Sequence, residues 1–369
     1  MKKKNKKKQS KPPLPAVRLS QCMIVKNEEK NIERALGWAK GIAFEQIVVD
    51  TGSTDRTVEI AEKLGAKVYH FKWINDFSAA KNFAIEQASG NWIAFLDADE
   101  YFSSKDAKKL MPFFKHIQSD PKLRSTWLVI QCPLLQVDEY SKTTSIVTQE
   151  RLFRNLPSIR YEGRIHEKLN IHVDNTVYGE DISIIHTGYN RASYGETDKV
   201  QRNIEMLKMA ISDDPGNIDL KGYLADALNV KAQMDGVAEN VLPEIDELYM
   251  EVINTDSDSL PQIKKSAYIY FIKKFMNDNN KCEEFEEMCN KALEEFPDDS
   301  DILYSRAIIL NKKGDYHAAL EVLRKCEDRI SDNEKLEMSK IFTSNPTLLQ
   351  EQIAIAKKGI EDRGTVHLS

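Results

Sequence analysis

The chain has 369 residues, of which 41% are hydrophobic and 30% charged, and this size and composition suit two or three globular domains. No apolar run approaches the ~20 residues of a membrane-spanning helix, so we expect no transmembrane segment and a cytoplasmic protein. Residues 1–16 carry seven lysines followed by prolines, which predicts a disordered basic tail. Without those lysines the formal charge of −6 becomes about −13, and so acidic a body argues against nucleic acid as a partner.

The five cysteines are odd in number, and no pair has CxxC spacing. We therefore expect neither a zinc site nor a disulfide framework, but reduced thiols. Cys282 and Cys289 lie seven residues apart in a helical pattern, which favours a packing role for both.

Up to about residue 190 the chain alternates between predicted strands and predicted helices. The strands are expected at 17–25, 45–50, 66–71 and 93–96, and the helices at 27–40, 53–65 and 78–90. Strands separated by helices of ~10–15 residues predict βαβ units, and hence an α/β domain with a mainly parallel sheet. Ligands of such sheets bind beyond the carboxyl ends of the strands, where Asp50 and Asp97 both lie.

From about residue 195 the pattern is helical throughout. Ala210, Val252 and Ala292 occupy equivalent places at spacings of 42 and 40 residues, and Phe285 and Ala319 are equivalent at 34. A period of ~34 residues with helix–turn–helix content is typical of tetratricopeptide repeats, whose stacked helix pairs bind extended partners. The alternative is that these helices only brace the first domain.

The segment GNWIAFLDADEYF (90–102) leads four apolar residues directly into Asp97, Asp99 and Glu100. Carboxylates this close repel one another and resist desolvation, so a neutralising partner is expected. Alternate residues of a strand share a face, and paired carboxylates suit Mg²⁺ or Mn²⁺ bridged to a substrate phosphate. The structural alternative is that Asp99 caps a helix that starts near Ser103.

Three blocks over residues 18–102 resemble the family 2 glycosyltransferases of GT-A fold in order and spacing: MIVKNEEKNIERAL, IVVDTGSTDRTVEIAEKLGAKV and FSAAKNFAIEQASGNWIAFLDADE. The later segments ERLFRN (150–155), YEGRIHEKL (161–169) and IIHTGY (184–189) resemble one branch of that family. The branch includes bacterial sugar transferases with tetratricopeptide repeats and the peptide glycosyltransferases of glycosylated bacteriocins. The resemblance covers about half the chain and implies a Rossmann-like GT-A domain that takes a UDP-sugar donor.

The same resemblance implies a donor site composed of Val25, Asn27, Glu28, Asp50, Lys81, Asp97, Ala98 and Arg151. Asp50 would hold the uracil or ribose end, Asp97 would reach the ribose side, and Asp99 would bind the metal. Asp50 and Ser53 are equally suited to a turn and a helix cap, and Asn27 to capping its own helix.

An inverting transfer needs a base that takes the proton of the acceptor hydroxyl or thiol. The resemblance favours Glu167 for this role, with His166 as the alternative base and Glu162 as a third candidate. In an extended segment, neighbouring residues point to opposite faces, so we expect only one of His166 and Glu167 to face the donor. Ordinary packing of His166 is the alternative.

The leaving diphosphate needs positive charge in addition to the metal. By its place in the family, His186 is a candidate second metal ligand or phosphate contact, although a structural role is the alternative. Lys81 would face the nucleotide or its phosphates. Arg151, Arg154 and Arg164 could clamp phosphates, and Arg151 is preferred because the branch repeats an RLFR block there; solvated arginines are the alternative.

These observations predict a GT-A domain at 17–193 and an all-α repeat domain at 194–369. The expected activity is metal-dependent, inverting transfer of a sugar from a UDP-sugar to a peptide or protein Ser, Thr or Cys. The Gln-x-x-Arg-Trp block and membrane helices of the family's polymerases are missing from this sequence, which favours addition of one or a few sugars. A cell-envelope saccharide acceptor, a nucleotidyltransferase, a non-catalytic repeat scaffold and a homodimeric state stay open as alternatives.

Overall fold

The computed structural model describes residues 15–188, 197–236, 243–255, 260–276, 278–332 and 345–366. The chain divides into two compact units, Met1–Asn190 and Arg191–Ser369. The predicted boundary between 193 and 194 lies outside the described residues, as does nearly all of the predicted basic tail at 1–16.

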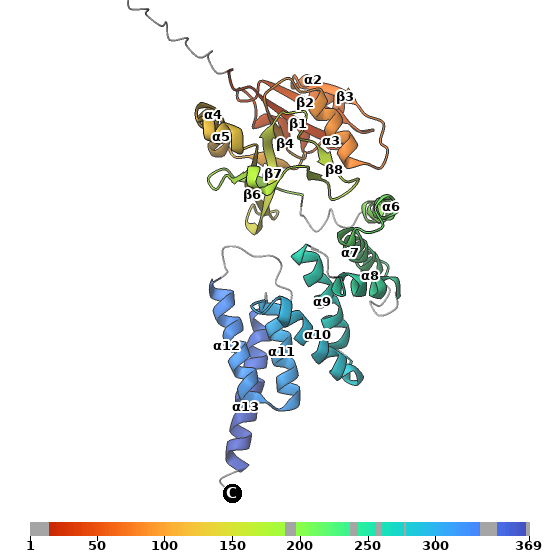
Figure 1. The fold of residues 1–369 in the computed structure, drawn as a ribbon, viewed down its shortest axis with the longest axis vertical. Helices are drawn as coiled ribbons and strands as arrows, with labels where there is room; N and C mark the ends of the chain where they lie inside the picture. The colour runs from red at the N-terminus through yellow and green to blue at the C-terminus, as the bar shows by residue number, and fades with distance from the viewer. Residues whose placement is uncertain are drawn as a thin grey trace, which may run out of the picture. The chain divides into compact units, whose positions relative to one another are not determined.

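A nine-stranded sheet of order β3-β2-β1-β4-β7-β6-β11-β5, with β10 paired to β6, forms the first unit (Figure 1). Its strands are β1 (Leu19–Val25), β2 (Glu45–Asp50), β3 (Lys67–His70), β4 (Trp92–Phe95), β5 (Glu100–Phe102), β6 (Val129–Val137), β7 (Thr143–Arg154), β10 (Thr176–Tyr178) and β11 (Ile184–His186). The first four strands in chain order pair in parallel, as βαβ units require.

The sheet is mixed: five of its eight strand pairs are parallel, as expected for a mainly parallel sheet, and three are antiparallel. Strand β7 runs antiparallel to both β4 and β6, and β5 runs antiparallel to β11. Only a short turn joins β6 to β7, and a short turn permits an antiparallel pair only. A separate hairpin of β8 (Tyr161–Glu162) and β9 (Lys168–Leu169) follows β7 along the chain.

Helices cover both faces of the sheet. They are α1 (Ile32–Gly37), α2 (Thr57–Lys63), α3 (Phe77–Glu86), α4 (Ser104–Ser119) and α5 (Pro121–Thr126). Side chains alternate along β4, so that Trp92 and Ala94 pack with α4 whereas Ile93 and Phe95 pack with α3. All four side chains are fully buried, so packing on both faces holds β4 as far as Phe95, just before the acidic residues.

The loops after β1 and β2 are joined to each other, which makes α1 and α2 shorter than the predicted helices. Asn27 has a left-handed φ of 58°, and its side-chain oxygen accepts a hydrogen bond from Thr54 N at 2.8 Å. The backbone N–H of Asn27 donates to Ser53 Oγ at 2.9 Å. Residues 27–31 and 53–56 therefore form loops at the carboxyl edge of the sheet instead of helical turns.

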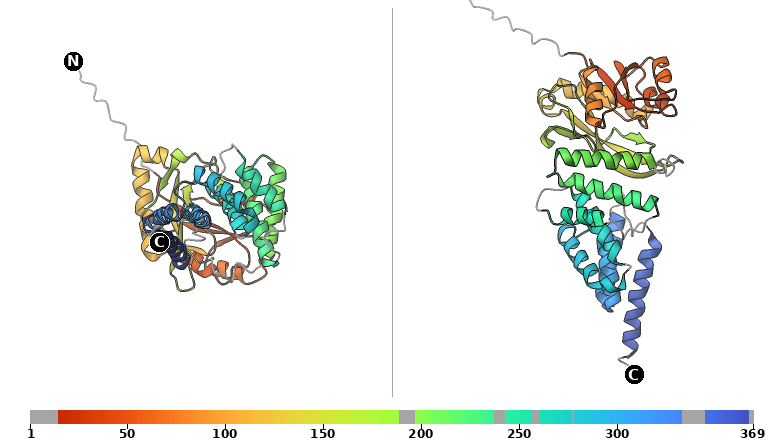
Figure 2. Two further views of the ribbon diagram at one scale, coloured as in Figure 1. Left: turned by 90° about the horizontal axis from the view of Figure 1, so that it is seen from below. Right: turned by 90° about the vertical axis from the view of Figure 1, so that its right-hand side faces the viewer.

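The second unit is entirely helical in its described part. Its helices are α6 (Thr197–Asp213), α7 (Ile218–Met234), α8 (Pro243–Ile253), α9 (Pro261–Met276), α10 (Cys282–Glu295), α11 (Ser300–Lys313), α12 (Tyr316–Asp332) and α13 (Pro346–Val366), with a short 3₁₀ turn, η3 (Asn279–Lys281), before α10. Helices consecutive in the chain pack against each other, as α6 and α7 do side by side in Figure 2. The positions predicted to be equivalent in the repeats are all buried: Ala210, Val252, Phe285, Ala292 and Ala319.

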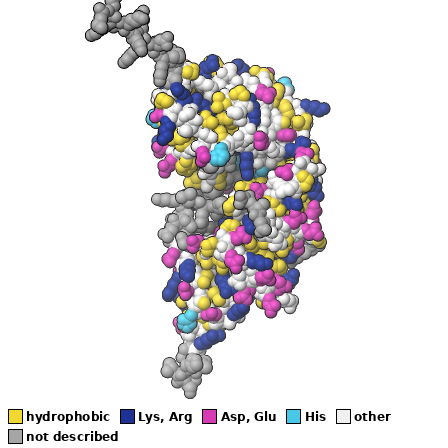
Figure 3. All heavy atoms as spheres, in the orientation of Figure 1, with side chains coloured by type: hydrophobic (Ala, Val, Ile, Leu, Met, Phe, Trp, Pro, Cys, Tyr) yellow, Lys and Arg dark blue, Asp and Glu magenta, His cyan; other side chains and the backbone are white. Residues whose placement is uncertain are grey.

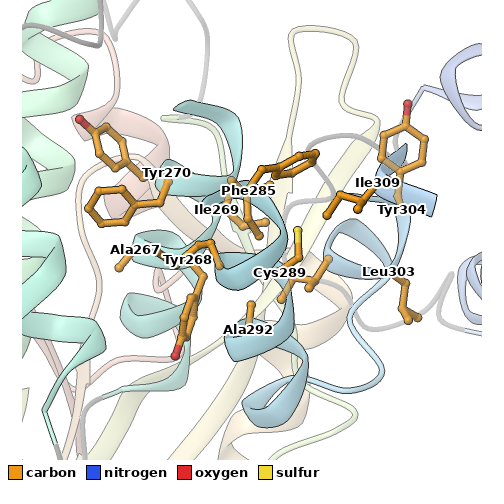
Figure 4. Packing of buried hydrophobic residues seen from close by; sticks show 14 of the residues in the cluster. Ala267, Tyr268, Ile269, Tyr270, Phe285, Cys289, Ala292, Leu303, Tyr304 and Ile309 are labelled. Carbon is orange, nitrogen blue, oxygen red and sulfur yellow. The ribbon is translucent and has the colours of Figure 1, made fainter. Parts of the chain in front are cut away.

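One apolar core runs through the helices of the second unit (Figure 4). Cys289 packs in it beside Phe285, but Cys282 is exposed, so the predicted packing role is wrong for Cys282. All five thiols are free, as expected.

Tyrosine–carboxylate hydrogen bonds join neighbouring helices at the edge of that core. The Tyr249 hydroxyl donates to Asp226 at 2.6 Å and that of Tyr270 donates to Asp246 at 2.8 Å. Both carboxylates lie on the preceding helix, so each bond fixes one helix against the next.

Acidic and basic side chains are interspersed on the visible surface of each unit in Figure 3. Among the described residues drawn on that face, the basic side chains form no continuous patch. Among the described helices, none combines the length and apolarity needed to cross a membrane.

Candidate active site

Two basic side chains neutralise the acidic end of β4. Arg151, on β7, places Nη2 2.9 Å from Asp97 Oδ2 and 2.6 Å from Glu100 Oε1. Lys81, on α3, places Nζ 3.8 Å from Asp97 Oδ1. Because β7 pairs with β4 and α3 packs beneath it, the fold itself brings both cations to the carboxylates.

The pKa values follow from this arrangement. Burial alone would raise the pKa of Asp97, but Lys81 and Arg151 outweigh it and hold that pKa at about 2. Glu100 is 2% exposed, and burial raises its pKa despite the charge of Arg151. The protein therefore supplies basic partners of its own for Asp97 and Glu100, and the prediction of a divalent cation concerns Asp99.

Lys81 also contacts the predicted base. Its ammonium lies 2.7 Å from Glu167 Oε1 and beside the contacting rings of Phe95 and Tyr161, 5.2 and 5.0 Å from their centroids. Burial alone would lower the pKa of Lys81, but the charges of Asp97 and Glu167 raise it above its usual range. Lys81 is thus a buried cation shared by the donor side and the acceptor side of the predicted site.

His166 and Glu167 lie in the turn between β8 and β9, not in an extended segment as expected. His166 has a left-handed φ of 53° and is exposed. The Glu167 side chain is 14% exposed and points to Lys81. Of the two candidate bases, Glu167 is therefore the one held against the strand-end cluster, whereas Glu162, on β8, is exposed.

Asp99 and His186 form a second pair beside this network. Strand β11 pairs with β5 so that His186 lies opposite Glu100, and this brings His186 Nε2 to 3.3 Å from Asp99 Oδ2. Burial alone would lower the pKa of His186, but its hydrogen bond to Asp99 and the nearby carboxylates raise it. Ser103 caps α4 by accepting from Asp106 N at 3.1 Å, so the alternative of Asp99 as that cap is wrong.

The Asp99–His186 pair suits a divalent cation that also binds phosphate. No cluster of three or more metal-binding side chains occurs in the described parts of the chain, so the protein would supply two ligands. Substrate phosphates and water commonly complete magnesium sites of this kind. Gly188 leaves the necessary room, since a Cβ there would lie 1.9 Å from Asp99 Oδ2 and 2.8 Å from His186 Nε2.

The predicted nucleotide end of the site is formed by the joined loops. The buried Asp50 carboxylate accepts hydrogen bonds from Gly52 N at 3.2 Å and Ser53 N at 3.0 Å, and His70 Nδ1 lies 3.4 Å away. Asp50 thus fills the structural role of a turn residue, and the same turn places it at the strand end expected for a uracil contact.

The other predicted donor residues differ in exposure. Asn27 is exposed at the edge and Glu28 is partly buried, with its amide donating to Thr57 Oγ1 at 2.7 Å. Val25 and Ala98 are 2% and 5% exposed and pack together in one core cluster. These two side chains are therefore core residues, and their role at the donor site stays a prediction.

Two of the predicted phosphate-binding arginines lie away from the strand-end cluster. Arg154 stacks over the Trp92 ring, 4.7 Å from its centroid, at the amino end of β4. Arg164 Nη1 lies 3.8 Å from Asp76 Oδ2. Only Arg151 joins Asp97, so the interpretation of Arg154 and Arg164 as phosphate clamps has no support from their positions.

Sequence reasoning missed Arg34 and Thr187, which adjoin the Asp99–His186 pair. Arg34 Nη2 donates to Thr187 Oγ1 at 2.7 Å, and the guanidinium lies 4.9 Å from the Tyr101 ring centroid. The Thr187 hydroxyl and amide both donate to Asp99 O, at 3.2 and 3.1 Å. Both residues stand in motifs that were already quoted, NIERAL and IIHTGY, but their contact spans 153 positions and depends on the fold.

The topology and the carboxylates at the strand ends define a GT-A-type domain followed by a helical domain. Residues 20–120 match Glycosyl transferase family 2, and residues 288–321 match a tetratricopeptide repeat. The chain therefore contains a family 2 glycosyltransferase segment and a tetratricopeptide repeat, as the resemblance implied.

Two curated relatives each name one of these features. A TPR repeat-containing protein of Synechococcus elongatus is 41% identical over 149 residues, which cover 40% of this chain and 34% of that protein. The SPbeta prophage-derived glycosyltransferase SunS of Bacillus subtilis is 29% identical over 200 residues, 53% of this chain and 45% of SunS. The chain thus spans less than half the length of either relative.

Among solved structures, S. aureus TarS in complex with UDP-GlcNAc is 15% identical, with a TM-score of 0.38. The alignment covers 80% of this chain and 92% of that one. At this TM-score, the assignment of the fold depends on the sheet topology and the family match alone.

Proposed function

We propose that the chain is a metal-dependent inverting glycosyltransferase that moves a sugar from a UDP-sugar to a Ser, Thr or Cys side chain of a peptide or protein. One observation carries this proposal: in the unit that contains the family 2 match at 20–120, the Asp99–His186 pair, the compensated Asp97 and the carboxylate of Glu167 gather at one edge of the sheet. The relative SunS, whose name describes a glycosyltransferase, supports the reaction class.

The proposed chemistry separates two tasks. Asp99 and His186 would hold Mg²⁺ or Mn²⁺, which when bound stabilises the negative charge of the leaving diphosphate. Glu167 takes the proton of the acceptor hydroxyl or thiol as that atom bonds to the anomeric carbon and the bond to the diphosphate breaks. Attack from the side opposite the leaving group inverts the anomeric centre.

The acceptor class follows from the second unit. Stacked helix pairs of the tetratricopeptide type present extended surfaces to polypeptides, and a matching repeat lies at 288–321. The resemblance to peptide glycosyltransferases of bacteriocins points the same way. We therefore favour a polypeptide acceptor over a saccharide.

The test begins with a panel of UDP-sugars and Mn²⁺, in which hydrolysis of the donor identifies the sugar. We expect Asp99→Ala to lose the calorimetric heat of UDP binding in the presence of Mn²⁺ while its circular dichroism spectrum stays unchanged. We expect Glu167→Gln to keep that heat but to lose ~10²–10⁴-fold in turnover.

Glu162→Gln is the matched control, because it makes the same change on the neighbouring strand at an exposed site. It should turn over at the wild-type rate. A wild-type protein that shows no heat with UDP and Mn²⁺ would contradict the donor assignment. Full turnover by Glu167→Gln would contradict the assignment of the base.

A further inference from the structure

Helix α3 holds the segment that carries Glu167. Phe77 N donates to the carbonyl of residue 164 at 2.8 Å, and Ser78 Oγ donates to that of residue 163 at 2.6 Å. The Asn82 side chain forms two 2.9 Å hydrogen bonds with the backbone of Tyr161, one in each direction. The Ser78 and Asn82 side chains are about one helical turn apart and lie on one face of α3. Together with the Phe77 amide, they hold the β8–β9 hairpin against the helix.

Lys81 lies in the middle of this face and differs from its neighbours, because it reaches beyond the turn. Its ammonium lies beside the contacting rings of Phe95 and Tyr161 and forms ion pairs with Glu167 at 2.7 Å and Asp97 at 3.8 Å. Only 3% of the residue is exposed. This one buried charge is therefore shared by two carboxylates, of which Glu167 is the nearer.

This geometry differs from that of a phosphate-binding lysine, which exposes its ammonium to the ligand. Here the rings exclude water, and the two carboxylates are the near partners of the charge. The same contacts fix the distance between Glu167, which is on the acceptor side, and Asp97, which lies beside the donor. A carboxylate held in this way needs no reorganisation when the acceptor arrives.

We propose that Lys81 is a positioning residue, which acts through Glu167 by holding its carboxylate in place to receive the acceptor's proton. This inference depends on the proposed function, in which Glu167 is the base. In the transfer step the proton of the acceptor O–H or S–H moves to Glu167, and the freed electron pair forms the bond to the anomeric carbon. The electron pair of the breaking bond leaves with the diphosphate, and Lys81 keeps its own protons throughout.

The test compares Lys81→Met with the wild type. Methionine keeps an unbranched apolar side chain beside the rings of Phe95 and Tyr161 but removes the charge. We expect kcat to fall ~10²-fold, with the donor KM and the heat of UDP binding in Mn²⁺ within about 3-fold of wild type. Lys81→Arg, which restores a cation, should recover most of kcat, and Lys109→Met, which removes a lysine from the α4 surface, should leave kcat unchanged.

The pH profile of kcat separates positioning from a general structural effect. The charged or titratable groups around the Glu167 carboxylate are Lys81 from α3, Asp97 after β4, Tyr161 from β8, and the flanking His166 and Lys168. Lys81→Met removes the cation that forms an ion pair with this carboxylate. The acidic limb of the kcat profile should therefore move to higher pH in Lys81→Met, and the activity of the variant should recover partly at high pH.

A double variant decides whether Lys81 acts through Glu167. Adding Lys81→Met to Glu167→Gln should lower kcat no further than Glu167→Gln alone. A further loss, or a large rise in donor KM with kcat unchanged, overturns the proposal and makes Lys81 a donor contact. If Lys81→Met does not fold, Lys81→Gln is measured in the same assays and must show the same shift of the pH profile.

The two levels of proposal fail differently. Full turnover by Glu167→Gln refutes the proposed function of Glu167 and with it this inference. Loss of turnover in Glu167→Gln combined with wild-type kcat and pH profile in Lys81→Met refutes the positioning role alone.

Discussion

The compensation of the strand-end carboxylates by Arg151 gives a prediction whose size follows from the structure. Arg151→Met removes the guanidinium 2.6 Å from Glu100 and 2.9 Å from Asp97. Asp97 keeps Lys81 and partial contact with solvent, but Glu100 is 2% exposed and loses its only charged partner in the described part of the chain. Leaving a buried charge without its partner costs about 3–5 kcal/mol, so we expect the free energy of unfolding to fall by about 3 kcal/mol at neutral pH.

The effect has a defined pH dependence. Burial already raises the pKa of Glu100 in the folded protein, and loss of Arg151 raises it further, while the unfolded value stays at about 4.3. The folded variant therefore binds a proton that the unfolded chain does not, and its stability falls as pH rises between these two pKa values. The loss of unfolding free energy in Arg151→Met should be complete above the pKa of Glu100 in the folded variant, and it should shrink as pH falls towards about 4. Adding Glu100→Gln should restore most of the loss at neutral pH.

Urea denaturation followed by tryptophan fluorescence measures this in the full chain. All four tryptophans lie within the first 127 residues, so the signal reports the first unit alone. Arg154→Met is the matched control, three residues along the same strand, where the guanidinium stacks on Trp92 instead of pairing with an acid. We expect it to cost about 1 kcal/mol. A loss in Arg151→Met no larger than in this control, or one that persists at pH 4, would refute the argument.

Two further predictions concern the metal site and the opposite edge of the sheet. Gly188→Ala places a Cβ 1.9 Å from Asp99 Oδ2, so Mn²⁺ affinity measured calorimetrically with UDP should fall ~10–100-fold. The control is Gly37→Ala, whose added Cβ meets nothing within 4 Å and which should bind Mn²⁺ as the wild type does. Equal heats of binding in the two variants would contradict the assignment of the metal site. Burial alone would raise the pKa of Glu45, but hydrogen bonds, that of Lys67 first, hold it at about 2. Because a lowered pKa stabilises the fold above the unfolded value of about 4.3, Glu45→Gln should cost about 2 kcal/mol at pH 7, less than the full shift because Lys67 is 55% exposed. In urea denaturation the difference in unfolding free energy between Glu45→Gln and the wild type should disappear as pH falls from about 4 towards 2. A difference that does not change with pH would show that the Glu45 charge is not its cause.

Local pattern was sufficient for the elements that form the carboxyl edge. Strand β2 occupies the predicted 45–50, and β1 and β4 begin and end within about two residues of their predictions, because buried apolar runs bounded by turn residues are strong local signals. Helix α1 was predicted over 27–40 but covers only Ile32–Gly37. Its first residues are used instead to join two loops, through contacts such as Asn27 to Thr54, which span 27 positions.

Long-range pairing is what the sequence did not reveal. Nothing local indicates that β7 lies antiparallel beside β4, and that register is what brings Arg151 to Asp97 across 54 positions. Likewise the β5–β11 pairing brings His186 to Asp99 across 87 positions. The candidate residues could be named from motifs, but the partner of each charge depended on strand order.

The distribution of charge at the edge locates the cation more narrowly than the motif does. Asp97 is shared by Lys81 and Arg151, and Glu100 is paired with Arg151. Asp99, in the described part of the chain, forms an ion pair with His186 and none with lysine or arginine. A cation is attracted most strongly to the carboxylate with the least compensated charge. In the proposed function this is Asp99, whose ion-pair partner in the described chain is an imidazole, whereas Asp97 belongs to a network with a lysine and an arginine.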